Sequence, residues 1–226
     1  MSKIICIDAG HGGRDPGAVG NGLKEADLTS CIAQGVAQRL EAYACEVHMV
    51  PRTEDLAERA AYANSHRANL FLSIHVNAGG GTGFESYTYL TTGVETKETQ
   101  TVIHNAVMGY MQKFNMPDRG QKATNFQVLR ETAMPAVLLE CLFIDRQEDA
   151  KLLKSPVFLD GLANEVAYGV VQALGLQKVS VDDPKPDPCA NCQRISDLII
   201  ENTKLHDENM RTKQLIKEVK ILLNNI

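Results

Sequence analysis

A glycine-rich stretch near the start of the chain, residues 8–25 (DAGHGGRDPGAVGNGLKE), most constrains the fold. It follows the apolar residues 4–7 (IICI), which are typical of a buried strand. Six glycines are incompatible with a helix, so we expect a loop whose backbone can fold tightly around a ligand. His11 lies near the start of this loop and Glu25 at its end, and both side chains are metal ligands in proteins.

Two later apolar runs each carry one further polar residue. Residues 70–74 (LFLSI) predict a buried strand that delivers His75 at its carboxyl end. In residues 136–144 (AVLLECLFI) one carboxylate, Glu140, interrupts an otherwise apolar strand and could supply a base. Two imidazoles and one carboxylate from different elements are the ligand set of a catalytic zinc site, whose fourth position stays open for water. We therefore predict a zinc site formed by His11, Glu25 and His75.

Strands and helices alternate along most of the chain. Apolar residues recur at helical spacing in four segments: about 25–43, 56–68, 94–114 and 147–175, the last of them broken near Ser155 and Pro156. Strands are expected between them, including a short one at residues 126–129. This alternation predicts an α/β fold, a three-layer αβα sandwich with a mostly parallel sheet. In such sheets the ligand site lies at the carboxyl ends of the strands, where His11, His75 and Glu140 fall.

Composition limits the partners and the compartment. With 226 residues, 44% hydrophobic content and a formal charge of -5, the chain can bury one sizeable core and leave an appendage. The acidic balance argues against nucleic acid or an anionic membrane as a partner. No apolar run approaches the roughly 18 residues of a membrane span, and the start MSKIICIDAG does not resemble a signal peptide. We expect synthesis in the cytoplasm without a signal peptide.

A series of motifs carries a resemblance to a known family. The motifs are DAGHGG with Glu25, Arg52 in PRTED, Arg59, residues 63–64 (AN), LFLSIHVNA, residues 125–126 (NF) with 128–130 (VLR), and MPAVLLECLFI. In this order and spacing they resemble the type-3 zinc N-acetylmuramoyl-L-alanine amidases, cell-wall hydrolases found among bacterial autolysins, sporulation enzymes and phage endolysins. The resemblance covers about residues 3–176. Its one small departure is Pro51, where threonine is common in such enzymes.

The resemblance implies a site and a reaction. It places the zinc ligands on His11, Glu25 and His75 and the catalytic glutamate on Glu140. The family cleaves the amide between the lactyl group of N-acetylmuramic acid and L-alanine of the stem peptide, so peptidoglycan is the expected partner. Without a signal peptide, we expect the protein to reach the wall through cell lysis, a phage holin or another nonclassical route.

Two other kinds of function remain open. One is a noncatalytic peptidoglycan-binding or assembly module on the same fold, although a pure binder has no need of Glu140. The other is a different zinc hydrolase, such as a carboxypeptidase that acts within the stem peptide. The sequence does not distinguish a phage endolysin from a bacterial autolysin.

Two further polar residues are candidates at the edge of the site. Asp8, at the end of the first predicted strand, could accept a hydrogen bond from His11 and orient it, or be merely solvated. Asn77 is a candidate for a hydrogen bond to substrate, with a turn-forming role as the alternative.

The last part of the chain has a different composition. We predict a catalytic domain over residues 1–178, a proline- and aspartate-rich linker over 179–188 and a C-terminal helix over 189–226. Heptads from 195 to 226 favour a coiled coil that joins copies of the chain, a parallel dimer in preference, because Asn202 and Asn209 occupy successive a positions. A helix folded back on the catalytic domain is the alternative. We expect Cys189 and Cys192 to be free thiols, with a metal between chains or a disulfide as alternatives.

Overall fold

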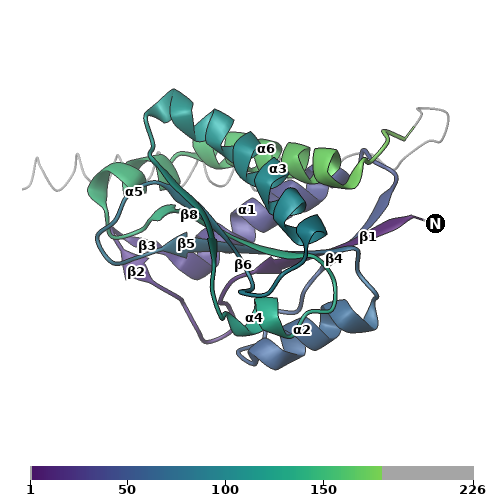
Figure 1. The fold of residues 1–226 in the computed structure, drawn as a ribbon. Helices are drawn as coiled ribbons and strands as arrows, with labels where there is room; N and C mark the ends of the chain where they lie inside the picture. Colours follow the sequence, from purple (N-terminus) through teal and green to yellow (C-terminus); the bar gives the residue numbers. More distant parts are fainter. Residues whose placement is uncertain (1, 180–226) are drawn as a thin grey trace, which may run out of the picture. The chain divides into compact units, whose positions relative to one another are not determined.

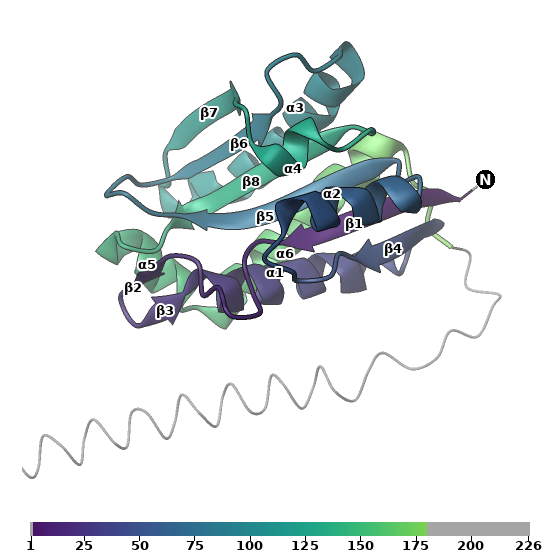
Figure 2. The same cartoon turned by 90° about the horizontal axis from the view of Figure 1, so that it is seen from below.

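A six-stranded sheet forms the centre of the computed structural model, which describes residues 2–179 (Figure 1). Across the sheet the order is β4-β1-β5-β8-β6-β7, which Figure 2 shows from below. The strands are β1 (Lys3–Ala9), β4 (Cys45–Met49), β5 (Leu70–Asn77), β6 (Phe84–Thr88), β7 (Asp118–Ala123) and β8 (Ala136–Phe143). The predicted coiled coil and Cys189 and Cys192 lie outside the described residues, as does the predicted linker apart from Val179.

The sheet is mostly parallel, as the sequence predicts. Strand β1 pairs in parallel with β4 and β5, β5 with β8, and β6 with β7. The exception is the antiparallel pair of β6 and β8. The carboxyl ends of β1, β5 and β8 therefore meet at one edge of the sheet, where α/β proteins commonly bind ligands.

Helices cover both faces of this sheet (Figure 1). On one face lie α1 (Glu25–Leu40), α3 (Val94–Met111) and α6 (Pro156–Leu174), and on the other α2 (Leu56–Ser65) and α4 (Gln127–Arg130). The remaining elements are β2 (Val19–Gly20), β3 (Leu23–Lys24), the 3-10 turn η1 (Gln112–Phe114) and α5 (Gln147–Leu153). No helix within residues 2–179 is both long and apolar enough to cross a membrane.

The apolar run of β5 shows why these residues form a central strand. Leu70, Leu72 and Ile74 pack in the core under α1, α3 and α6, whereas Phe71 packs in the smaller core under α2 and α4. A strand buried on both faces needs an apolar residue at nearly every position, so its sequence reads as a continuous apolar run. Towards the carboxyl end of the strand the polar residues His75 and Asn77 are only partly buried.

Two predicted elements differ in the structure. Residues 126–129 are not a strand: the segment is the single helical turn α4. Val128 and Leu129 are both buried against the same core, which a helical turn allows and an alternating strand does not. So short an apolar segment does not reveal its period. The predicted helix 94–114 ends earlier, because α3 stops at Met111 and tightens into η1.

Candidate metal centre

The structure brings His11, Glu25 and His75 together at the carboxyl edge of the sheet. His11 lies in the loop after β1, Glu25 is the first residue of α1 and His75 lies near the end of β5. One carboxylate oxygen of Glu25 lies 3.1 Å from Nε2 of His11 and the other 3.0 Å from Nδ1 of His75. One ligand atom from each residue lies within 4.8 Å of those of the other two. These are three donors of the types that bind zinc, gathered around one point.

Two glycines make this approach possible. A side chain on Gly10 would overlap the imidazole of His75. A Cβ on Gly17, whose φ is +64°, would lie 2.7 Å from Oε2 of Glu25 and 2.7 Å from Cδ2 of His11. His11 itself has a φ of +61°, a left-handed conformation that costs energy in any residue with a side chain. The glycine loop is thus shaped to hold these three side chains against one another.

The pKa values of Glu25 and His11 are both shifted by their surroundings. Burial raises the pKa of Glu25, but hydrogen bonds with His11 and His75 oppose this, and the net result lies far below the usual range. The hydrogen bond to Glu25 raises the pKa of His11 to about 9, against the opposing effect of burial, and Asp15 adds to the rise. A proton on His11 therefore supplies the positive charge beside the buried Glu25 carboxylate, a place that a bound cation would equally fill.

The residue that orients His11 is Asp15. Its Oδ2 lies 2.6 Å from Nδ1 of His11, and its Oδ1 accepts a hydrogen bond of 2.9 Å from the backbone N–H of Gly17. The expectation that Asp8 would accept a bond from His11 is wrong. Asp8 accepts from Nη1 of Arg59 and from Oγ of Ser73, its register partner on β5, both at 2.8 Å.

Asp8 nevertheless supports the loop through Arg59. That buried guanidinium contacts Asp8, donates to the carbonyl oxygen of Ala9 at 3.0 Å and donates through Nη2 to the carbonyl oxygen of His11 at 2.8 Å. Nε of Arg52 donates to the same His11 oxygen at 3.3 Å. These two arginines fix the backbone of His11 in its left-handed conformation.

Glu140 lies beside the three candidate ligands. It is the register partner of His75 on the adjacent parallel strand β8. Its Oε2 atom is buried and has no hydrogen-bond partner. Among the side chains of residues 2–179, no other buried nitrogen or oxygen atom lacks a partner. Burial raises the pKa of this carboxyl to about 7. A buried, unpartnered carboxylate oxygen is costly unless a ligand or water completes it, so the residues present fit a metal with a water beside Glu140.

Asn77 is committed to contacts within the protein. Its Nδ2 donates to Oε1 of Glu85 at 2.6 Å, and its Oδ1 accepts from the backbone N–H of Ala78 at 2.8 Å. A substrate contact by Asn77 stays a prediction. Glu85, which sequence reasoning missed, is a buried carboxylate directly opposite Glu140 in the β6–β8 pair.

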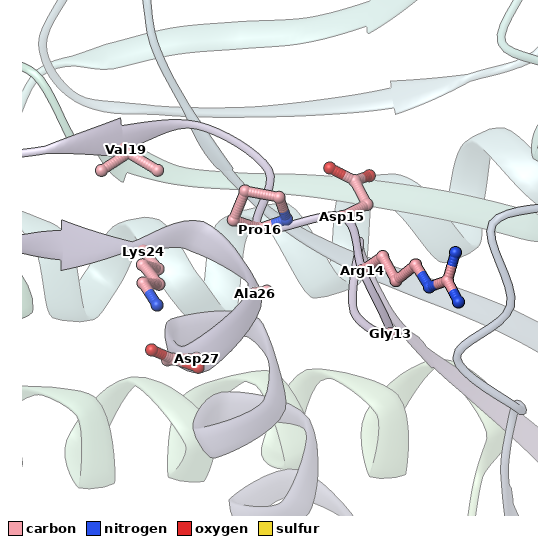
Figure 3. Close-up of a pocket in the computed structure, with 8 residues that line it drawn as sticks. All are labelled: Gly13, Arg14, Asp15, Pro16, Val19, Lys24, Ala26 and Asp27. Carbon is pink, nitrogen blue, oxygen red and sulfur yellow. The ribbon is translucent and has the colours of Figure 1, made fainter.

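A surface pocket of about 400 Å³ flanks the cluster (Figure 3). The glycine loop, β2, β3 and the first turn of α1 line it, through Gly13, Arg14, Asp15, Pro16, Val19, Lys24, Ala26 and Asp27. It shares Asp15 with the contact to His11, but His75 and Glu140 do not line it. The pocket therefore lies next to the candidate metal centre and does not contain it.

The fold and site define a mostly parallel α/β domain with a His-Glu-His cluster and a buried carboxylate at the carboxyl edge of its sheet. The family model described as N-acetylmuramoyl-L-alanine amidase matches residues 5–172. The chain belongs to this family, as the resemblance of its motifs implies.

Individual relatives agree with this assignment. The chain is 43% identical over 187 residues to an endolysin of Bacillus phage SPP1, covering 80% of this chain and 69% of the relative. It is 48% identical over 185 residues to a sporulation-specific N-acetylmuramoyl-L-alanine amidase of Bacillus subtilis, covering 80% and 71%.

Solved structures share the fold. A crystal structure of an N-acetylmuramoyl-L-alanine amidase from Clostridium difficile 630 superposes with a TM-score of 0.72 at 30% identity, covering 77% of this chain and 97% of that one. The catalytic domain of an amidase from Bacillus (Paenibacillus) polymyxa gives a TM-score of 0.72 at 32% identity, with 77% and 99% covered.

Proposed function

We propose that this protein is a zinc-dependent peptidoglycan amidase that cleaves the bond between N-acetylmuramic acid and the L-alanine of the stem peptide. Family membership and relatives named as an endolysin and as N-acetylmuramoyl-L-alanine amidases support a wall-degrading hydrolase. The observation that carries the chemistry is the buried, unpartnered Oε2 of Glu140 beside the cluster of His11, Glu25 and His75.

Each of the four residues has a distinct role in this proposal. His11, Glu25 and His75 would hold Zn²⁺, which when bound would make water a nucleophile near neutral pH and polarise the amide carbonyl. Glu140 Oε2 accepts the proton of the attacking water, and Glu140 then donates that proton to the leaving amine nitrogen. Burial raises the pKa of Glu140 to about 7 in the metal-free site, and a bound cation would lower this pKa and favour the carboxylate that accepts the proton. Such proton transfer contributes about 100- to 10,000-fold to a rate.

Mass spectrometry of digested peptidoglycan tests this proposal. Purified walls are incubated with the zinc-loaded full chain and, as a matched control, with Glu140→Gln. The expected products are stem peptides with a free L-alanine amine, absent from the control digest. Cuts within the stem peptide would instead identify a different zinc hydrolase. A folded, zinc-loaded protein that binds walls without releasing products would favour the noncatalytic binding module.

We further propose that residues 195–226 join two copies of the chain as a parallel coiled coil, after the linker 179–188. The heptad pattern of the sequence supports this. Two catalytic domains on one polymeric wall would gain avidity if the linkers span their sites. Sedimentation equilibrium of the full chain and of residues 1–178 tests it: a dimer and a monomer are expected, and a monomeric full chain would contradict the proposal.

A further inference from the structure

A row of ionisable side chains crosses the sheet from the candidate metal centre. His75 on β5 is the register partner of Glu140 on β8, and Glu140 is the register partner of Glu85 on β6. Register partners on neighbouring strands point to the same face of a sheet, about 5 Å apart. Glu85 therefore lies one strand beyond the candidate base, on the same face.

Two cations of the edge strand β7 meet at Glu85. Nε of Arg119 donates to Oε2 of Glu85 at 3.0 Å, and Nζ of Lys122 contacts the same oxygen. Asn77 occupies the other oxygen. The Glu85 side chain is 3% exposed, whereas those of Arg119 and Lys122 are 34% and 38% exposed. A buried anion thus holds the two cations, while their side chains remain partly exposed to solvent.

An irregularity in β7 produces this arrangement. Arg119 and Lys122 are three residues apart, so in a regular strand their side chains would point to opposite faces. The β6–β7 register shifts between the pairs Phe84–Asp118 and Ser86–Gln121, and Gly120 within this bulge has a φ of +88°. The extra residue turns both cations to the face of Glu85.

The two cations are also held over aromatic rings. The guanidinium of Arg119 lies 4.8 Å from the ring centre of Phe143, and Nζ of Lys122 lies 5.7 Å from that of Tyr87. Within residues 2–179 the two terminal nitrogens of Arg119 make no hydrogen bond. The guanidinium of Arg119 is therefore held in place while its two terminal nitrogens keep free N–H donors, an arrangement that is preorganised to bind a carboxylate.

Neutralising Glu85 requires one cation, and the structure supplies two. One positive charge of this pair is therefore left without a counter-charge. It lies at Glu85, on the strand next to that of Glu140, the candidate base. We propose that Arg119 and Lys122 form a carboxylate-binding subsite for the stem peptide. This inference rests on the proposed amidase function, because it assumes that the scissile amide lies at Glu140.

The distance from Glu140 to the two cations indicates which carboxylate of the stem peptide they would bind. The charged ends of both cations converge on Glu85, about 5 Å from the level of Glu140. An extended chain advances about 3.3 to 3.6 Å per residue. The α-carboxylate of the residue that follows L-alanine therefore lies at the right distance, and the subsite would distinguish a stem peptide that carries it free from one that carries it as a carboxamide.

Binding of two synthetic muropeptides tests the subsite. They are identical except that the residue after L-alanine carries an α-carboxylate in one and an α-carboxamide in the other. Calorimetry uses the full chain with zinc and the Glu140→Gln substitution, which prevents turnover. We expect Arg119→Gln to weaken binding of the carboxylate form about 10- to 100-fold and to leave the carboxamide form unchanged. Lys122→Gln should act in the same direction.

The matched control is Arg39→Gln, an arginine of α1 that pairs with Asp160 on the other side of the sheet. It should bind both muropeptides like the parent. Equal parental affinity for both forms, no binding of the carboxylate form, or equal weakening of both by Arg119→Gln would overturn the subsite. A wild-type chain that releases stem peptides from walls but shows any of these results keeps the amidase proposal and loses only the subsite.

Discussion

Nδ1 of His11 lies 2.6 Å from Oδ2 of Asp15, on the side of the imidazole opposite to the contact between Nε2 and Glu25. Once a metal displaces the proton that Nε2 shares with Glu25, a hydrogen bond from Nδ1–H to this carboxylate holds the tautomer whose Nε2 binds the metal. It also aims the ring at Glu25. Carboxylates that accept from metal-binding histidines in this way fix the ring and raise its basicity.

Asp15→Ala is therefore expected to weaken zinc binding by about 10- to 100-fold. Competition with a chelating dye measures this affinity. Asp160→Ala is the control, because that exposed aspartate pairs with Arg39, far along the chain from the candidate ligands, and its loss should leave zinc affinity unchanged. Unaltered affinity in Asp15→Ala would show that the contact does not orient the ligand.

Gly17→Ala is expected to abolish tight metal binding, because the new methyl group would push Glu25 and His11 apart. Gly22→Ala is a matched control: Gly22 also has a positive φ, +78°, but nothing lies within 4 Å of its Cβ position. Both substitutions should cost about 1 to 2 kcal/mol of stability through the backbone. Zinc stoichiometry by atomic absorption separates them, and equal zinc contents would refute the steric role of Gly17.

Glu140→Gln is expected to change how the stability of the metal-free protein depends on pH. Burial raises the pKa of Glu140 from 4.5 to about 7, so between these values the folded protein holds a proton that the unfolded chain releases. The carboxyl therefore destabilises the fold as pH rises through this window, by up to about 3 kcal/mol above pH 7.

Thermal melts with a chelator present test this linkage. Glu140→Gln and the parent should differ least below pH 4.5 and most above pH 7, where the variant has the higher melting temperature. A constant difference across this range would mean that Glu140 does not titrate there.

Asp149→Ala is expected to destabilise the protein by about 3 kcal/mol, because it leaves several buried donors unpaired. The buried carboxylate accepts from Oγ1 of Thr82 at 2.5 Å and from the backbone N–H groups of Gly83 and Phe143 at 3.1 and 2.9 Å. It thus joins the loop after β5 to the end of β8. Urea unfolding measures the change.

Asp145→Ala is the control for this loop. Its exposed carboxylate also accepts two backbone hydrogen bonds, from Gly79 and Gly80 at 2.8 Å each. Because water can replace it, the expected loss is below about 1 kcal/mol. Similar losses of unfolding free energy in the two variants would contradict the prediction that the buried Asp149 stabilises this loop more than the exposed Asp145 does.

The sheet and the centre of the site could be predicted because they follow from local patterns. Apolar runs that end in His75 or contain Glu140 predict central strands, and the rule that ligands bind at carboxyl ends brings them together. The spatial cluster with His11 and Glu25 agrees with that prediction.

Other features depend on geometry that no local pattern contains. Asp8 and Asp15 are both plausible partners for His11, and only the path of the loop decides between them. The meeting of Arg119 and Lys122 at Glu85 depends on a bulge that the sequence marks with a single glycine. Residues 126–129 were too few to show whether they form a strand or a helical turn.

His75 and Glu140 lie on two central strands, whereas His11 lies on a loop in a strained backbone conformation. Loops of this kind open at a lower free energy than the strands of a core. With zinc bound as proposed, we expect moderate heating to detach His11 and release the metal while the sheet still holds His75 and Glu140 at their spacing. An enzyme inactivated in this way should recover on cooling with added zinc, and its heat tolerance would then depend on metal retention before it depends on unfolding.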